Sequence, residues 1–289
     1  MRATTRNAAL AVIAALAALA AVAAVAVSVV VGGYRAGSAA ASVADKDTLV
    51  IGVDDDVPGL GTRTPGGGYE GFEVDVATYV AGRLGVTGDA VEFTTIHPDD
   101  WERALRAGAV DLVFAGRSMT PELAERVTFA GPYYVAHQTI LARAGDESIK
   151  KVRDLGGKRL CQVAGDRSAE HVTRDLGIDA ILVPAGSHIE CVGMLAQGRL
   201  DAVSADDLIL AGARATAGDT DLMIVNAPFT EERYGVALKK GDVRGCAAVN
   251  RALTEMYQSG AAKTMIDQRF GSPGLSAATA TAPRFEGCA

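Results

Sequence analysis

Hydrophobic and polar positions follow three successive patterns along the chain. Residues 8–31 carry no charged side chain and a single polar one, Ser28. Residues 32–47 are mostly small. From residue 48 onward, short apolar runs alternate with stretches in which apolar residues recur at helical spacing. This order predicts a membrane-inserted segment, a small-residue linker and a folded α/β region.

The apolar N-terminal segment is long enough to cross a membrane. At about 1.5 Å per residue it exceeds the roughly 30 Å hydrocarbon core of a bilayer. Arg2 and Arg6 precede it, which predicts a cytoplasmic N-terminus and an extracytoplasmic chain beyond it. Secretory signals have shorter apolar regions, but 42–44 (SVA) resembles a cleavage site. Because the apolar run is longer than that of a typical signal, we expect residues 1–44 to be an uncleaved anchor and linker. The alternative is a protein secreted after cleavage behind Ala44.

The alternating region reads as strands that take turns with helices. Strands are predicted at 48–53, 91–95, 110–115, 158–163, 181–183 and 200–205. Helices are predicted at 74–84, 99–108, 168–177, 190–198 and 207–215. Such alternation is typical of an α/β fold with parallel sheets.

Two stretches of this region repeat one pattern. LRAGAVDLVFA (105–115) and LAQGRLDAVSA (195–205) share Leu, Gly, Asp, Val and Ala at the same spacing. Each reads as a helix end capped by glycine and followed by a strand. We expect two similar lobes whose strands end facing each other, because open α/β sheets bind ligands at those ends.

The residues that follow each repeat suggest a binding site. After the first repeat, Thr120, Pro121 and Glu122 form a good helix start, with threonine as N-cap. The capping role alone would explain Thr120, but free N–H groups at a helix start also attract a carboxylate. Asp206 follows the second repeat. If it faces Thr120 across a cleft, the pair would match a zwitterionic amino acid.

Composition narrows the possible functions. The chain has 289 residues, 5% aromatic residues and a net charge of −7, so it lacks the basic stripe of a nucleic-acid-binding protein. We expect no cofactor and no metal, since His97, His137, His171 and His188 lack ligand spacing relative to the cysteines. The even set of four cysteines favours disulfides over buried free thiols in an exported protein, with three pairings possible.

Several motifs, taken in order, resemble a known family. They include DVPGLG (56–61), YEGFEVDVA (69–77), GAVDLVFAG (108–116), ECVGMLAQGRLDAVSADDLILAG (190–212) and PFTEERYGVALKKGD (228–242). Over about residues 49–271 the chain resembles solute-binding proteins of polar amino-acid ABC transporters, above all the actinobacterial glutamate-binding type.

The resemblance implies a two-lobed clamp of the type II periplasmic-binding-protein fold, with a hinge of two crossing strands. Lobe one would span 48–138 plus 232–270, lobe two 139–231, and residues 271–289 would form a tail. The hinge would lie near 138–142 and 231–236, and a helix over 243–257 would pack back on lobe one. Pairing Cys161 with Cys191 and Cys246 with Cys288 keeps each disulfide within one section of this architecture.

Family positions also imply ligand contacts. Asp206 matches the acid that pairs with an α-ammonium group, and Ser118 and Thr120 match contacts to the α-carboxylate. The remaining matches are cleft residues of the first loop and of the second-lobe turn 165–168: Asp56, Gly59, Leu60, Arg167 and Ser168.

The sequence departs from the family at the carboxylate site. Leu123 stands where the family has an arginine that grips the α-carboxylate, a loss of a few kcal/mol unless replaced. We expect Arg117 to substitute, and Arg126 to be a surface partner of Glu122. Arg167 in the second lobe is the other candidate, unless the ligand is not a standard α-amino acid. His137 replaces a hinge glycine, and we expect it to be solvated.

These features predict a monomeric, extracytoplasmic protein that captures a polar, acidic amino acid resembling glutamate and delivers it to an ABC permease. The alternative is a membrane-tethered sensor that uses the same clamp without transport. We expect no catalytic residues, because the chain has no G-x-S-x-G motif and no metal-ligand cluster.

Overall fold

A computed structural model describes residues 42–164, 166–218, 221–225, 227–271 and 282–288. The predicted anchor over 8–31 and Gly165 of the second-lobe turn lie outside these ranges. Within them, no helix combines the length and hydrophobicity that a membrane crossing requires.

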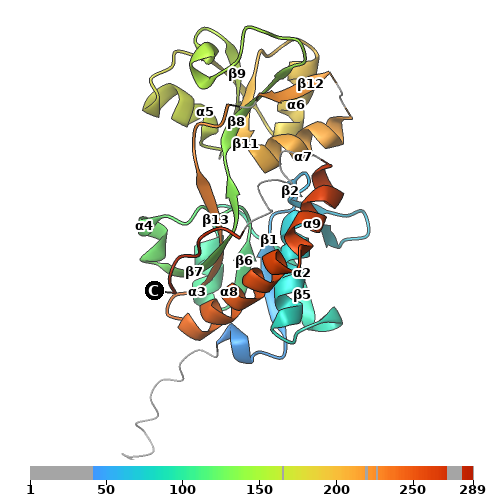
Figure 1. Ribbon diagram of the computed structural model, residues 1–289, viewed down its shortest axis with the longest axis vertical. Helices are drawn as coiled ribbons and strands as arrows, with labels where there is room; N and C mark the ends of the chain where they lie inside the picture. Colours follow the sequence, from blue (N-terminus) through green and yellow to red (C-terminus); the bar gives the residue numbers. More distant parts are fainter. Residues whose placement is uncertain (1–41, 165, 219–220, 226, 272–281, 289) are drawn as a thin grey trace, which may run out of the picture. The chain divides into compact units, whose positions relative to one another are not determined.

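Helices and strands alternate as the hydrophobic pattern predicts (Figure 1). The strands are β1 (Leu49–Val53), β2 (Asp56–Val57), β3 (Gly61–Arg63), β4 (Tyr69–Glu70), β5 (Val91–Thr95), β6 (Leu112–Phe114), β7 (Val127–Ala136), β8 (Gln138–Arg143), β9 (Arg159–Val163), β10 (Ile181–Ala185), β11 (Val203–Asp206), β12 (Leu222–Val225) and β13 (Glu232–Lys239).

The α-helices are α2 (Phe72–Arg83), α3 (Trp101–Ala107), α4 (Pro121–Ala124), α5 (Ser168–Glu170), α6 (His188–Ala196), α7 (Asp207–Ala217), α8 (Val243–Gln258) and α9 (Ala261–Phe270). Short 3₁₀ turns are η1 (Val43–Asp45), η2 (Gly88–Ala90) and η3 (Val152–Leu155). The single helix predicted over 168–177 is in fact α5 followed by a π-helical turn, η4 (His171–Asp175).

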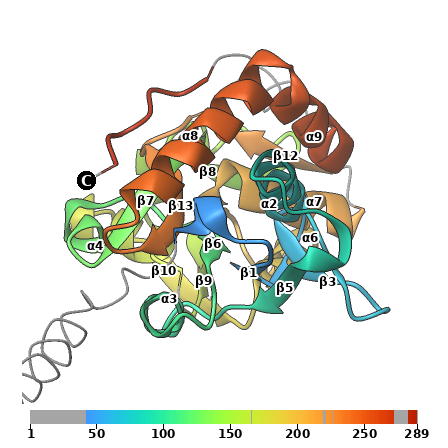
Figure 2. The same ribbon diagram turned by 90° about the horizontal axis from the view of Figure 1, so that it is seen from below.

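The largest sheet has the strand order β5-β1-β6-β13-β7. In β6, Leu112 and Phe114 face a core shared with α2 and α8, while Val113 faces a second core with α3. Figure 2 shows α2 and α8 on one side of this sheet and α3 on the other. We call this sheet and its helices lobe one.

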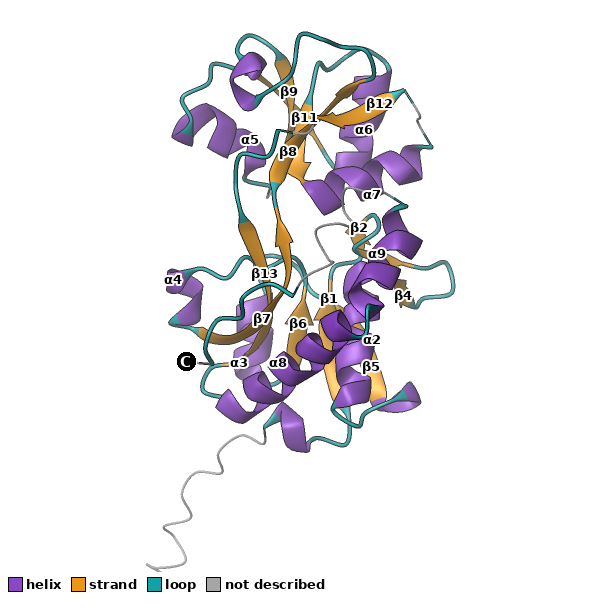
Figure 3. Ribbon diagram, viewed as in Figure 1, coloured by secondary structure: helices purple, strands orange, loops and turns teal. Residues whose placement is uncertain are grey.

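A second group of strands consists of the sheet β11-β8-β12 and the pair β10-β9, which Leu160 and Ala202 connect by a parallel bridge (Figure 3). Helices α5, α6 and α7 pack against these strands through two further cores. We call this group lobe two.

The expectation of parallel sheets holds only in part. Strand β1 is parallel to β5 and β6, but β13 is antiparallel to β6 and β7, and β8 is antiparallel to β11 and β12. The reason is that β8 and β13 connect the lobes. Each enters a sheet at the edge where that sheet's own strands end, so it must run against them.

Two chain segments pass between the lobes. Only His137 separates β7 from β8, and the return segment runs into β13. Beside it, the Gln138 N–H donates to the Thr230 hydroxyl, and the Phe229 N–H donates to the Gln138 carbonyl. The two crossings are therefore hydrogen-bonded to each other, as expected for a paired hinge.

The internal repeat has the same local structure in both lobes. Gly108 and Gly198 follow α3 and α6, and both have a φ of 73°. Asp111 and Asp201 then play equivalent parts, because each carboxylate accepts the backbone N–H of the neighbouring strand, from Val50 and Arg159 respectively. The predicted duplication is confirmed.

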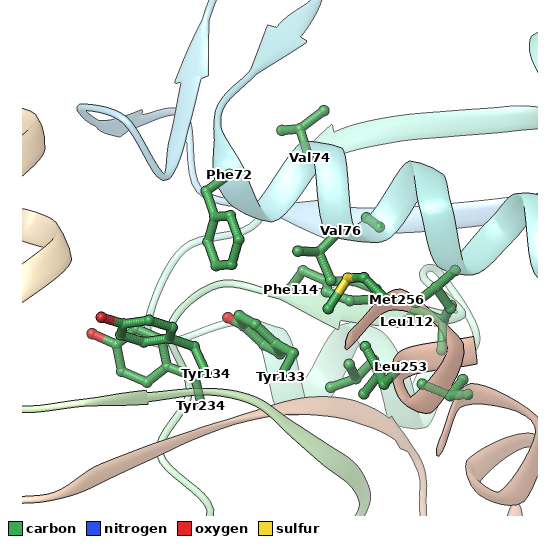
Figure 4. Close-up of a cluster of buried hydrophobic side chains, with 14 of the residues drawn as sticks. Phe72, Val74, Val76, Leu112, Phe114, Tyr133, Tyr134, Tyr234, Leu253 and Met256 are labelled. Carbon is green, nitrogen blue, oxygen red and sulfur yellow. The ribbon is translucent and has the colours of Figure 1, made fainter. Parts of the chain in front are cut away.

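The core of lobe one contains a cluster of buried aromatic rings. Figure 4 shows Phe72 of α2 beside Tyr133, Tyr134 and Tyr234 from β7 and β13, and their ring centroids lie 6.0–6.3 Å apart in successive contacts. The hydroxyl of Tyr134 donates to Asp207, which belongs to lobe two. The cluster therefore anchors the crossing strands to the core and reaches the other lobe.

Both disulfides match the expected pairing. Cys161 on β9 is bonded to Cys191 on α6, and Cys246 on α8 is bonded to Cys288 in the tail. The tail is also fixed by Glu286, whose backbone N–H donates to the Gly131 carbonyl. Each covalent link therefore joins elements of one lobe.

Folded structure begins before the candidate cleavage site. Val43 is 5% exposed and packs in the main core of lobe one, and its backbone N–H donates to Asp242 Oδ2 at 2.9 Å. Cleavage behind Ala44 would remove this contact from the folded protein.

Candidate functional site

A cleft of about 870 Å³ lies where the central strands of both lobes end. Its walls include Asp54–Asp56 after β1, Ala115–Ser118 after β6, and Asp206 at the end of β11. This is the edge at which α/β sheets bind small molecules. The two copies of the repeat thus bring Ser118, Thr120 and Asp206 to one cavity, as the sequence predicts.

Asp206 is the acid at the boundary between the lobes. It occupies the N-cap position of α7, but its side chain makes no capping bond and instead accepts from the hydroxyl of Tyr234 in β13. The pKa of Asp206 is raised to about 7, mainly by burial; the Tyr234 bond opposes this rise and the nearby Glu232 carboxylate adds to it. A cationic group placed beside it would favour the ionised carboxylate.

The turn after β6 uses its hydroxyls internally. Thr120 Oγ1 accepts from the Leu123 N–H at 3.3 Å, which confirms the N-cap, and Ser118 Oγ donates to Glu232 at 2.6 Å. The helix that Thr120 caps has only four residues. Because so short a helix has a weak dipole, its N-terminus should attract a carboxylate only weakly, in contrast to the prediction from the sequence.

Arg117 also has a partner within the protein. Its Nη2 lies 3.1 Å from Asp54 Oδ1, its side chain is 19% exposed, and its Nε has no hydrogen-bond partner in the described part of the chain. Burial raises the pKa of Asp54, and Arg117 opposes that rise. The guanidinium expected to replace the missing family arginine is therefore already hydrogen-bonded to a carboxyl group of the protein.

A buried acid supports the turn from behind. Glu73 in α2 is fully buried, and its Oε1 accepts from the Gly116 N–H and from the Tyr133 hydroxyl. Burial raises the pKa of Glu73, while the Tyr133 and Gly116 bonds lower it. These bonds fix the backbone from which Arg117 projects.

The remaining predicted contacts divide into two groups. Asp56, Leu60 and Arg167 line the cleft, and Arg167 is exposed with no side-chain partner among the described residues. Ser168 does not line it, because it is buried and shares a hydrogen bond with Ser204. Gly59 does not line it either.

The position of Gly59 has a structural cause. Its φ is +78°, and its carbonyl accepts the first free N–H of α2, from Phe72, at 2.8 Å. A Cβ at Gly59 would meet the ring of Phe270 at 2.5 Å. The residue thus holds the loop against lobe one instead of facing a ligand.

Two other sequence predictions concern residues at the edge of the site. Arg126 lies outside the cleft, where it pairs with Glu102 and also donates to the Glu122 carbonyl, so it is the surface residue that we expect but with a different main partner. His137 is 38% exposed, in agreement with a solvated hinge histidine, and lies 3.9 Å from Asp207.

Sequence reasoning missed several residues of the cleft wall. Glu232, Tyr234, Gln138 and Asp54 all line it. Glu232 and Tyr234 are two positions apart on β13, a spacing that places both side chains on one face of a strand. That alternation was the available signal, but the sequence did not reveal which face meets the cleft.

Histidine–carboxylate pairs line part of the lobe-two wall. His188 Nε2 lies 2.7 Å from Asp166, and His171 Nδ1 lies 2.8 Å from Asp175. No cluster of three or more potential metal ligands occurs in the part of the chain that the structure describes.

The chain matches a known family over most of its length. Residues 49–272 match the model of bacterial extracellular solute-binding proteins, family 3. The chain belongs to this family. It therefore has the periplasmic-binding-protein-like α/β fold and an extracytoplasmic role in binding solutes.

Its relatives bind different amino acids. The glutamate-binding protein GluB of Corynebacterium glutamicum is 32% identical over 83% of this chain and 84% of its own. The glutamine-binding protein GlnH of Bacillus subtilis is 29% identical over 76% of this chain and 80% of its own. A solved structure of an ancestral arginine-binding protein bound to arginine is 31% identical, with a TM-score of 0.65, over 78% of this chain and 99% of its own.

Proposed function

We propose that this protein captures an amino acid in the cleft between its lobes and delivers it to an ABC permease. The main support for this proposal is the environment of Asp206. It is a buried carboxylate at the end of a central strand, it lines the cleft, and it has no cationic partner among the described residues. An α-ammonium group would supply the missing positive charge.

Capture would proceed by closure of the two lobes about the paired crossings. We divide the chain into 48–138 plus 232–270 and 139–231, and the strand order supports this division because β8 and β13 alone among these strands connect the two groups. Closure requires that the ligand bind the closed form better than the open one. Contacts from both lobes to one solute provide that difference.

The contacts that we propose come from both walls. Asp206 binds the ammonium group, and Asp56 and Leu60 line the space beside it. The exposed guanidinium of Arg167 is the better candidate for a carboxylate, because Arg117 is paired with Asp54. Ser118 and Thr120 can contribute only if ligand binding changes their present bonds to Glu232 and Leu123.

Family membership leaves the charge of the ligand's side chain open. The relatives named above bind glutamate, glutamine and arginine. The predicted glutamate-like ligand therefore stays one option among several. The sensor alternative has no support among the described residues.

Binding by a purified protein tests the capture step. The full chain in detergent, refolded free of carried-over solute, is titrated calorimetrically with the twenty amino acids. We expect micromolar or tighter binding of at least one of them, and an affinity at least a hundredfold weaker in Asp206→Asn.

The control variant is Asp179→Asn, since Asp179 is an exposed acid of lobe two outside the cleft. Unchanged affinity in Asp206→Asn would remove Asp206 from the site. Delivery is tested separately, by comparing uptake of the same amino acid in cells with and without the gene.

A further inference from the structure

We propose that the solute held in this cleft carries a net positive charge, as an organic cation built on ammonium or guanidinium groups. The proposal rests on the proposed capture function and adds the charge class of the ligand. It follows from the balance of charges in the cleft wall and from one buried acceptor that lacks a donor.

Carboxylates approach the cleft from both lobes. Lobe one contributes Asp54, Asp55, Asp56 and Glu232, and lobe two contributes Asp166, Glu170, Asp175 and Asp206. The guanidinium groups in the same wall are those of Arg117, Arg167 and Arg174. Acids therefore outnumber the permanently charged bases, and a cleft lined by one sign of charge attracts solutes of the opposite sign.

The bases do not neutralise the acids nearest the crossing strands. Arg117 pairs with Asp54 at 3.1 Å, and Arg174 lies 3.7 Å from Glu170. Among the described residues, the side chains of Asp206 and Glu232 accept hydrogen bonds only from hydroxyl groups, those of Tyr234 and Ser118, and no cation forms an ion pair with either. A negatively charged solute would meet these two carboxylates, and Arg167 is the one arginine of the described cleft wall without an ion pair to offset them.

Gln138 supplies an independent observation. It is 8% exposed, it lines the cleft, and its Oε1 has no hydrogen-bond partner among the residues that the structure describes. It is also the register partner of Asp206 in the antiparallel pair β8–β11. A buried acceptor without a donor is unfavourable, and an ammonium or guanidinium group offers several N–H donors at once.

Neighbouring acids contribute to the raised pKa of Asp206. The pKa of Asp206 is raised to about 7, mainly by burial; the Tyr234 bond lowers it, and the carboxylates of Glu232, Asp166 and Asp207 each contribute to the rise. A bound cation would relieve that repulsion and lower the pKa. Binding near neutral pH should then release protons, and the affinity should fall as the solution becomes more acidic.

The first test compares ligands of different charge on the full chain in detergent. Calorimetric titrations use L-arginine and L-lysine, their carboxylate-free counterparts agmatine and cadaverine, neutral L-glutamine and anionic L-glutamate. We expect at least one of the four cations to bind ten times more tightly than glutamine, with no measurable binding of glutamate.

The outcomes separate this inference from the capture function. Tighter binding of glutamate or glutamine overturns the cationic ligand and leaves amino-acid capture standing. Binding of agmatine or cadaverine without arginine or lysine supports the cation but overturns capture of an amino acid. If the folded protein binds none of the six compounds, the proposal of a cationic ligand is wrong. If it binds none of the twenty amino acids either, the proposed capture function is wrong as well.

The second test removes one charge while keeping shape. In Glu232→Gln the new side chain can still accept the Ser118 hydroxyl, and we expect affinity for the cation to fall tenfold or more. The matched control is Glu92→Gln, an exposed acid on β5 outside the cleft, which should bind normally. Equal losses for cationic and neutral ligands in Glu232→Gln would show that charge is not the reason.

Discussion

The position of Asp206 lowers the stability of the empty protein. Its carboxylate is buried between the lobes, accepts a bond from Tyr234, and has no cationic partner in the described part of the chain. In the unfolded chain the same group would be solvated, with an ordinary pKa of about 4. Residues that bind ligands often reduce stability in this way, because the partner they are arranged for is absent.

The raised pKa of Asp206, about 7, gives a prediction for stability. The folded state holds this proton up to a higher pH than the unfolded state does, so the group's contribution to stability falls as pH rises from about 4 to 7. Asp206→Asn removes that loss. We expect the ligand-free variant to exceed the wild type in free energy of unfolding at pH 7.5 by about 1–3 kcal/mol, with little difference at pH 4.

Denaturant unfolding of both proteins at the two pH values measures the difference. If the advantage of Asp206→Asn is the same at pH 4 and pH 7.5, protonation of the carboxylate is not responsible for it. Because the asparagine side chain can still accept the Tyr234 hydroxyl, loss of that bond should not mask the effect.

At the scale of elements, the lobes meet along a contact made possible by small residues. Helix α7 of lobe two passes the loop of lobe one so closely that a Cβ on Gly212 would lie 1.8 Å from the Pro58 carbonyl oxygen. A side chain there would push the helix and the loop apart. Gly212 is thus a point at which the approach of the lobes depends on the absence of a methyl group.

Gly212→Ala should therefore reduce stability by about 1–3 kcal/mol, the usual cost of overpacking, and should also weaken ligand binding. Gly193→Ala is the matched control, because Gly193 also lies within a helix but a Cβ added there would have no other atom within 4 Å. The control should gain up to about 1 kcal/mol from the helix propensity of alanine. Thermal unfolding and ligand titration of both variants test this prediction. Equal stability and equal affinity of Gly212→Ala and Gly193→Ala would contradict the close contact.

At the scale of the whole molecule, the folded unit extends to its first described residues. Val43 is buried in the core of lobe one and is bonded to Asp242 at the start of α8. The fold therefore depends on residues that cleavage behind Ala44 would remove. We therefore expect a mature chain that retains them.

Two soluble proteins test this boundary, one starting at residue 42 and one at residue 45. Loss of the buried Val43 side chain and its backbone bond should lower the free energy of unfolding by about 2 kcal/mol. Denaturant unfolding measures the difference, and Val43→Thr in the longer protein separates the side chain from the backbone bond. Equal stability of the two proteins would make cleavage behind Ala44 compatible with the fold.

The sequence by itself determined many of the alternating elements and the duplication, while the disulfide pairing followed from the architecture that the family resemblance implies. Periodicity marks strands and helices because it reflects local geometry, and the repeated glycine and aspartate have equivalent roles at Gly108 and Gly198 and at Asp111 and Asp201. The sequence also predicted that Thr120 and Asp206 share one cleft, because the strands of two such lobes end facing each other.

Tertiary structure alone decided which side chains meet. Arg117 could have faced a ligand, yet Asp54 lies 3.1 Å away, and Ser168 could have lined the cleft, yet it is buried against Ser204. The antiparallel entry of β8 places Gln138 beside Asp206. Partners distant in the sequence are set by how the lobes fold together, and the charge of the cleft depends on those partners. Local sequence patterns do not specify such contacts between distant residues.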